Sequence, residues 1–401
     1  MNKKNKKILL GMFYTFFVCG FIALMLGAIL PSLMEAYELD YDIAGLFFSA
    51  NSVGSLLASF VVGFFAPKLG LKKTIIIFSP LVFLAYIGVA TTNIVFLLIP
   101  LFVFVGLGLG CVNNINNFIL SGLAENKPEY ISLSHMFFAI GAFVSPFLAS
   151  LIMASGFGFK NIIYIGIILA ISMVLIYFVL PVGDFSAKVN KVERNTAEKP
   201  FYKHVNFYLA GFLLFFYLGM EMGISGFLVA YLTDYLSLDF DFATRQLSFL
   251  WLMIILGRLL TAYLSSKIKK TTILLISTLG AIATFVGFLL VSNPATITLI
   301  VLAFGLFISS IFPMTIASVS GILKQSSSAM GAFLAIVGLG GIFVPMIIGF
   351  LAHRFTIMTG MRSVIVSVVL MVLCAILLKV SVITNINSKH LHNSSQRKKY
   401  P

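Results

Sequence analysis

About twelve long apolar runs, separated by short polar joints, constrain this 401-residue chain more than any other feature of its sequence. A helix that crosses a membrane needs about 20 predominantly apolar residues, and each run is long enough. Hydrophobic residues make up 60% of the chain and charged residues only 10%, whereas soluble domains carry about 25% charged residues. The sequence therefore predicts an all-α membrane protein with twelve transmembrane helices.

We expect the spans at about 8–34, 43–66, 73–91, 94–123, 130–154, 160–181, 206–235, 242–265, 271–291, 294–322, 327–352 and 358–384. The first run is longer than the core of a secretory signal peptide, which is about 7–15 residues, so we interpret it as a span. Cys19, Cys111 and Cys374 lie inside runs and far apart, which indicates buried thiols and no metal-ligand spacing.

The basic residues predict how the chain is oriented. With both termini inside, all but five of the 27 Lys and Arg residues fall in cytoplasmic segments, as expected because these segments retain Lys and Arg. The exceptions are Lys160, Arg245, Arg258, Arg354 and Arg362. We therefore expect a multi-pass protein of the plasma (inner) membrane with both termini cytoplasmic. The net charge of +14 reflects this topology and does not indicate nucleic-acid binding.

An internal repeat appears when the sequence is shifted by 199 residues. Gly20 falls on Gly219, Lys68 on Lys267, Gly106 on Gly305, and Gly141 on Gly340, together with further glycines, prolines and acids. An even number of spans in each copy preserves topology, so the copies are parallel repeats about an axis along the membrane normal.

This repeat predicts two pseudo-symmetric six-helix bundles, at 1–183 and 205–385. The basic stretch 184–204 between them reads as a cytoplasmic linker. Residues 386–401 read as a cytoplasmic tail, which we expect to be disordered.

The segment GFFAPKLGLKK, which begins at residue 63, resembles the signature of the major facilitator superfamily between spans 2 and 3. The matching residues are Gly63, Lys68, Gly70, Lys72 and Lys73. Pro67 stands where the family has an Asp that takes part in a cytoplasmic charge relay, so the relay does not carry over. The resemblance implies the major facilitator fold and a secondary transporter that works by rocking-type alternating access.

The segments GLGLGCVNNINNF, SLSHMFFAIGAFVSPFL and FFYLGMEMGISGFLVAYL resemble the fucose permease-like sugar:proton symporters within that superfamily. This resemblance implies transport of a sugar or a similar small polar solute. The family's two carboxylates do not carry over, because the region around Ala28 holds no acid and the second position is Asn113. Proton coupling therefore stays open against uniport.

Two ionisable residues lie deep within spans, where a charge is expensive and usually functional. Glu221 shares a helix face with Tyr217 at i−4 and Ser225 at i+4. We assign Glu221 and Arg258 to proton coupling, and Tyr217 and Ser225 to solute binding. The alternatives are that Glu221 only bonds a neighbouring helix, and that Arg258 only holds helix ends through backbone carbonyls.

Amides cluster in the span 94–123, where Asn113, Asn114, Asn116 and Asn117 fall within five residues, and we assign Asn113, Asn114 and Asn117 to solute binding. Amides match the hydroxyls of a neutral sugar, but they are also common bonds between membrane helices. Asn51 is a further candidate of this kind. His135 can titrate near neutral pH or bridge helices, and Trp251 can stack on a sugar ring or simply pack.

The sequence contains no nucleotide-binding, metal or nucleophile motif, so we expect no cofactor, no metal and no enzymatic activity. The predicted partners are a small-molecule substrate, membrane lipid and, where transport is coupled, protons; we expect a monomer. Efflux of drugs or amphipathic compounds is an alternative function, because 41 Phe and 16 Met can line an adaptable pocket. A membrane receptor or scaffold that transports nothing is another.

Overall fold

The computed structural model describes residues 3–92, 94–123, 129–182, 200–323 and 327–397. Within these residues the structure has helices and no strands. The N-terminal half contains α1 (Lys3–Tyr37), α2 (Tyr41–Leu69), α3 (Leu71–Phe78), α4 (Pro80–Thr91), α5 (Val95–Leu123), α6 (Glu129–Ala154) and α7 (Lys160–Val179). The C-terminal half contains α8 (Val205–Ala230), α9 (Phe240–Leu264), α10 (Lys270–Leu290), α11 (Pro294–Ile308), α12 (Ile311–Leu323), α13 (Ser327–Arg354) and α14 (Ile357–Arg397).

These helices form twelve apolar spans, which confirms the predicted number and, within a few residues, the predicted positions. Two spans are broken. α3 and α4 meet at Ser79, directly before a proline that cannot donate a backbone hydrogen bond. α11 and α12 meet at Ser309 and Ser310, and the Ser310 hydroxyl donates to Ser277 of α10 over 2.5 Å. α8 continues as a π-helical turn at Tyr231–Tyr235.

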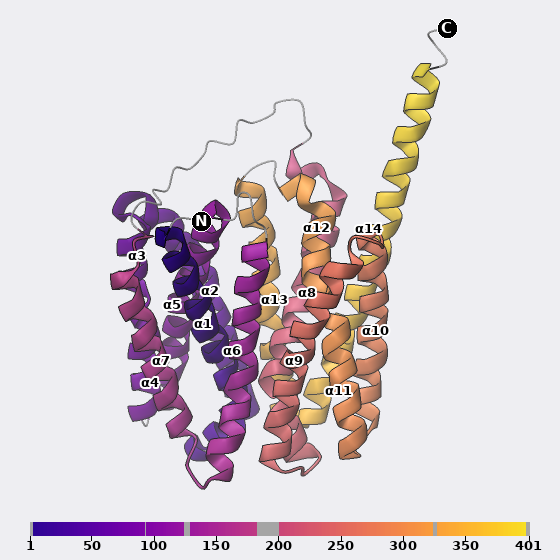
Figure 1. Ribbon diagram of the computed structural model, residues 1–401. Coiled ribbons are helices and arrows are strands. Elements are labelled where there is room, and N and C mark those ends of the chain that lie inside the picture. Colours follow the sequence, from indigo (N-terminus) through magenta and orange to yellow (C-terminus); the bar gives the residue numbers. More distant parts are fainter. Residues whose placement is uncertain (1–2, 93, 124–128, 183–199, 324–326, 398–401) are drawn as a thin grey trace.

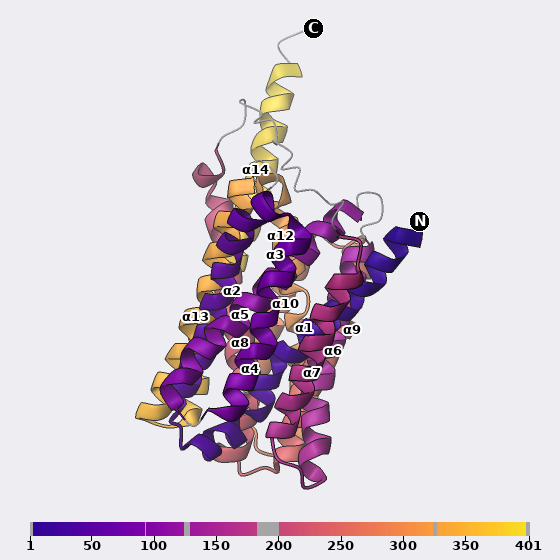
Figure 2. The ribbon, with the colours of Figure 1, turned by 90° about the vertical axis from the view of Figure 1, so that its left-hand side faces the viewer.

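The two halves stand side by side, and both described ends of the chain lie on the same face (Figures 1 and 2). We call this face the terminal face and the opposite one the distal face. In the N-terminal half α1 packs on α6 and α2 on α5; in the C-terminal half α8 packs on α13 and α9 on α11. The halves meet through three helix pairs, α2 with α13, α6 with α9, and α1 with α8.

The 199-residue repeat returns as a repeat of helix packing. A side chain at Gly106 would strike the backbone carbonyl of Asn51, and one at Gly305 would lie against the carbonyl of Leu250, which is the position one repeat further on. Such close approaches need glycine, because it has no Cβ. The two six-helix bundles are therefore pseudo-symmetric in contacts as well as in sequence.

Two predictions about the chain between and after the bundles have different outcomes. The tail was predicted to be disordered, whereas α14 continues to Arg397. No glycine or proline occurs between residues 361 and 400, so nothing in the sequence stops the helix. Most of the linker lies outside the described residues, apart from a short 3-10 turn at Phe201–Lys203. The domain boundaries stay predictions.

We predict that Gly141→Ala destabilises the protein, because its Cβ would press on the backbone of Phe17 and Phe21 in α1. Such overpacking costs about 1–3 kcal/mol. Gly321→Ala is the matched control, since no atom lies within 4 Å of its Cβ and alanine favours a helix by up to about 1 kcal/mol. Thermal unfolding in detergent should give shifts of opposite sign; equal shifts would contradict the packing argument.

Candidate functional site

Glu221 lies near the middle of α8 and is buried, with 9% of its surface exposed. The hydroxyl of Tyr217, one turn earlier on the same helix, donates a 2.8 Å hydrogen bond to Glu221 Oε1. The i−4 relation in the sequence predicted this shared face. The structure therefore presents a carboxylate held in place by a buried phenol.

Arg258 of α9 lies close enough to act electrostatically on both the Glu221 carboxylate and the Tyr217 hydroxyl. It acts in the same way on His135 of α6, which belongs to the other half. We call Tyr217, Glu221, Arg258 and His135 the central cluster. The sequence left open whether Arg258 reaches Glu221; the structure brings these two residues together and adds His135 from across the interface.

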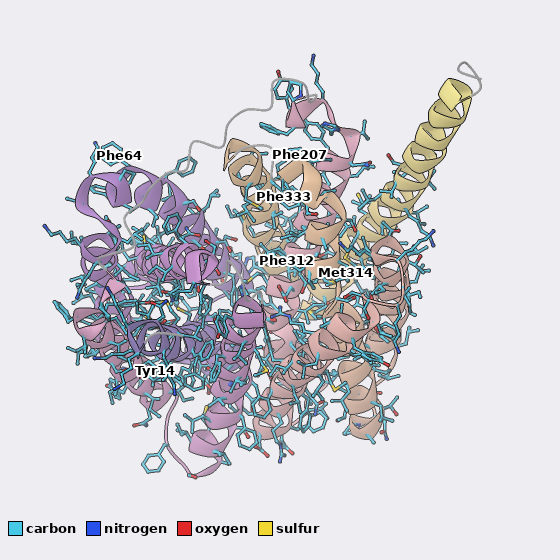
Figure 3. The ribbon with its side chains drawn as sticks, turned by 45° about the horizontal axis from the view of Figure 1, so that its top comes forward. Tyr14, Phe64, Phe207, Phe312, Met314 and Phe333 are labelled. Carbon is cyan, nitrogen blue, oxygen red and sulfur yellow. The ribbon has the colours of Figure 1, made fainter. Side chains whose placement is uncertain are left out.

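Aromatic rings surround the central cluster on several helices. The Trp251 ring lies 6.2 Å from Phe138, so α9 and α6 meet through aromatics as well. Phe16 of α1 lies 5.4 Å from His135, and Phe312 of α12 lies 6.2 Å from Tyr217; Figure 3 shows Phe312 on the C-terminal half. The sequence does not single out these three phenylalanines, because nothing distinguishes them from the other phenylalanines before the helices are assembled.

Several candidate polar side chains are buried without a hydrogen-bond partner among the described residues. They are Trp251 Nε1, Ser225 Oγ and Asn113 Oδ1. Such a group is expensive in an apolar interior unless something completes its hydrogen bonding. Ser225 lies where α8 meets α1, since its backbone carbonyl approaches Gly27.

The amides of α5 divide into different environments. Asn114 donates to the Ser59 hydroxyl of α2 over 3.2 Å, which favours the packing interpretation for this residue. Asn117 is exposed. The further candidate Asn51 lies on α2, and its backbone carbonyl packs against Gly106 of α5. Among the described residues no hydrogen bond joins these three amides to the central cluster.

Asn113 differs from its neighbours because its repeat position is Phe312. Phe312 packs on Tyr217 beside the interface between the halves. Pseudo-symmetry therefore places Asn113 at the matching point of the N-terminal half. Its half-buried side chain with an unpartnered oxygen fits that position.

Asn116, the remaining amide of α5, belongs to a buried polar network. Asn116 donates to the Thr15 hydroxyl over 2.9 Å and accepts from the Tyr177 hydroxyl over 2.7 Å. It thus joins α1, α5 and α7, and all three side chains are buried. The membrane interior offers no water to these polar groups, so they bond to one another. Asn116 thereby links three helices of the N-terminal half.

The signature segment is helical almost throughout. Gly63 and Lys68 lie within α2, and the expected loop shrinks to Gly70, whose φ of 83° lies in the left-handed region. Lys72 donates to the carbonyls of Phe178 and Leu180 at the end of α7, at 2.9 and 3.1 Å. A cation at a helix C-terminus is stabilising.

Lys68 and its repeat counterpart Lys267 each lie over an aromatic ring. Lys68 lies over the ring of Phe64 at 3.4 Å, and Lys267, one repeat later, lies over Tyr263 at 4.2 Å. Figure 3 shows Phe64 at the rim of the terminal face. Lys73 is exposed. The segment therefore joins helix ends at the terminal face and takes no part in the central cluster.

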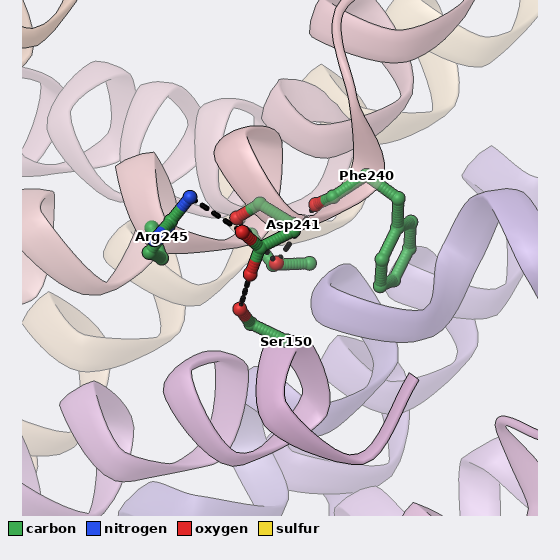
Figure 4. Close-up of polar contacts among 5 residues, drawn as sticks. Ser150, Phe240, Asp241 and Arg245 are labelled. Carbon is green, nitrogen blue, oxygen red and sulfur yellow. Dashed lines mark hydrogen bonds and ion pairs between the residues drawn. The ribbon is translucent and has the colours of Figure 1, made fainter. Parts of the chain in front are cut away.

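Polar contacts join the two halves at the distal face. The Tyr41 hydroxyl of α2 donates to the Asp234 carboxylate after α8. The Ser150 hydroxyl of α6 donates to Asp241 at the start of α9, which also pairs with Arg245 (Figure 4). Between α2 and α13, the Ser49 hydroxyl donates to the carbonyl of Ile342 over 2.7 Å. The halves are thus closed on each other at the distal face.

One group of side chains in the described residues has the chemistry of metal ligands. Asp40, Asp42 and His353 have donor atoms that all lie within 4.8 Å of one another, on the distal face. Sequence spacing did not reveal this group, because two of its members start α2 and the third ends α13. It is separate from the central cluster.

A family model described as Major Facilitator Superfamily matches residues 12–345. A Helicobacter pylori protein provisionally named as a glucose/galactose transporter is 24% identical over 379 residues, covering 89% of this chain and 92% of the relative. The glucose/mannose transporter GlcP of Bacillus subtilis is 23% identical over 366 residues, covering 86% and 88%.

Solved structures share the fold. A D-xylose-proton symporter superposes with a TM-score of 0.78 at 14% identity, covering 94% of this chain and 97% of that chain. The nucleoside transporter NupG gives a TM-score of 0.72 at 18% identity, covering 94% and 99%. At these identities the likeness establishes the architecture alone.

We predict that Asn113→Leu and Asn116→Leu fail in different ways. Asn116→Leu strands the hydroxyls of Thr15 and Tyr177 and should lower stability by about 1–3 kcal/mol. Asn113→Leu removes an unpartnered oxygen, so stability should be kept while solute affinity falls about fivefold, equivalent to one lost hydrogen bond of about 1 kcal/mol. Thermal unfolding and solute binding, measured on both variants, separate these effects. Unchanged solute affinity in Asn113→Leu would mean that Asn113 only packs between helices.

Proposed function

This chain belongs to the major facilitator superfamily, and we propose that it carries a sugar or a sugar-like small polar solute across the plasma membrane by alternating access. Like its relatives, it is a transporter and not an enzyme. Two relatives that each cover more than four fifths of the chain carry hexose names, which supports the choice of solute.

The observation that carries the proposal is the central cluster. Glu221, Tyr217 and Arg258 come from one half and His135 from the other, with Tyr217 and Glu221 buried and Arg258 and His135 half-buried. The carboxylate accepts hydrogen bonds, the guanidinium donates them, and the phenol can do either. This mixture suits the hydroxyls of a neutral sugar, because each hydroxyl both donates and accepts. The aromatic face of Trp251, with its unpartnered Nε1, suits the apolar face of a sugar ring and one hydroxyl.

Glu221 is also the proposed proton carrier. It is the one carboxylate buried among the described spans, and Arg258 of the same half is its counter-charge. Arg258 also acts on His135 of the other half, and this second distance can change when the halves rock. Protonation would remove the negative charge that offsets Arg258 and so strengthen its repulsion of a cation across the interface, which links binding a proton to moving the halves. We propose that the protein does this as a monomer.

We predict that Glu221→Gln abolishes accumulation driven by a pH gradient while keeping exchange of labelled for unlabelled solute. Glutamine keeps the shape and can still accept from Tyr217, but it cannot titrate. Uptake of a labelled sugar panel into proteoliposomes measures both activities, with Ser225→Ala as a variant that leaves the carboxylate intact.

The outcomes of this experiment separate the alternatives. Uphill accumulation retained in Glu221→Gln would rule out its proton role. Wild-type uptake without any proton flux would identify a uniporter and leave Glu221 with a positioning role. Transport of amphipathic compounds in place of sugars would identify the protein as an efflux transporter.

The terminal face is proposed to be cytoplasmic, because the basic residues concentrate there. With Cys374 replaced by Ser, a membrane-impermeant thiol reagent applied to intact cells should label Phe157→Cys and spare Tyr202→Cys. Both side chains are exposed, at 60% and 55%, and they lie on opposite faces. The reverse pattern would invert the topology.

A further inference from the structure

The distal face holds a group of donors shared between the two halves. Asp40 and Asp42 lie at the start of α2, and His353 lies in the last turn of α13. His353 Nδ1 is 3.5 Å from Asp40 Oδ1, and the donor atoms of all three lie within 4.8 Å of one another. Arg354 follows His353 but forms no ion pair with either of these described carboxylates.

The internal repeat shows what is unusual about this group. Asp241 is the repeat position of Asp42, and there the carboxylate is neutralised by Arg245 and bonded by Ser150. The N-terminal half has Leu46 where Arg245 stands. Asp40 and Asp42 therefore lack the matching cation, and among the described residues the imidazole of His353 is their one charged partner. Two carboxylates with one imidazole leave an excess of negative charge that a cation would balance.

We propose that Asp40, Asp42 and His353 bind a divalent transition-metal cation of the zinc type at the distal face. Zn²⁺ takes imidazole nitrogen and carboxylate oxygen at about 2.0–2.2 Å, which sets neighbouring tetrahedral ligands about 3.4 Å apart. The separation of 3.5 Å between His353 and Asp40 meets this requirement. Asp42 needs only a small side-chain movement, and one of its oxygens already accepts from the Ile43 amide over 2.8 Å. A water can fill the fourth position.

Such a cation would bridge the halves where they close. α2 belongs to one half and α13 to the other, so the complete ligand set exists only while the distal face is closed. A ligand that binds one of two conformations shifts the population toward that conformation. The cation would therefore slow alternation. This effect on transport rests on the proposed function, whereas metal binding itself does not.

The first test measures binding without any solute. The probe is Zn²⁺ alone, added to purified protein without an affinity tag that binds metal, with Cys374 replaced by Ser and the tail residues His390 and His392 by Ala. We expect Zn²⁺ to raise the thermal unfolding temperature in this background and to lose that effect in His353→Ala. Ser150→Ala breaks the bond to Asp241 at the repeat-related position but removes none of the three proposed metal ligands, so it should keep the zinc response.

The second test applies Zn²⁺ to the distal face only, in intact cells that take up labelled solute. We expect uptake to fall by about tenfold at saturation, within the usual range of coupling between sites, and the inhibition to disappear in His353→Ala and in Asp40→Asn. Zinc stabilisation that persists in His353→Ala would overturn the site. Stabilisation without inhibition of a protein that transports would overturn the link to alternation, and a protein that transports no solute would count only against the proposed function.

Discussion

The hydrocarbon interior of a membrane offers no water, and every other feature of this structure depends on that constraint. Backbone groups must bond within helices, and each buried polar side chain must find a partner inside the protein. Asn116 shows the rule obeyed, since both of its bonds go to buried hydroxyls. Trp251, Asn113 and Ser225 are among the buried groups that depart from it. Under the proposed function, a solute would complete the hydrogen bonding of these three.

The two halves share an architecture but not a chemistry. Tyr217 and Glu221 of α8 correspond to Val18 and Ile22 of α1, and Arg258 of α9 corresponds to Ser59 of α2. The repeat thus keeps glycine contacts that set helix spacing while the charged pair exists in one copy only. A charged pair in both copies would double the cost of burial in the membrane. One half therefore supplies the charged pair, and the other supplies His135 and the ring of Phe138.

Sequence predicted the parts of this arrangement that depend on one helix at a time. The spans follow from hydropathy, and the bond between Tyr217 and Glu221 follows from their spacing on one helix. The meeting of Arg258 with His135 could not be predicted, because it depends on how α6 and α9 are rotated and which faces they turn to each other. The same holds for the partners of Phe138, one phenylalanine among 41.

Closure of the distal face depends on polar contacts that are individually weak. The Asp40–His353 pair, which joins the start of α2 to the end of α13, keeps 70% and 43% of its side chains exposed. Exposed ion pairs contribute about 0–1 kcal/mol each, so these contacts hold the halves together by only a few kcal/mol. A transporter needs such a balance, because a conformation held much more tightly would not alternate with its opposite. The same balance explains why one cation at this face would be enough to shift the equilibrium between the conformations.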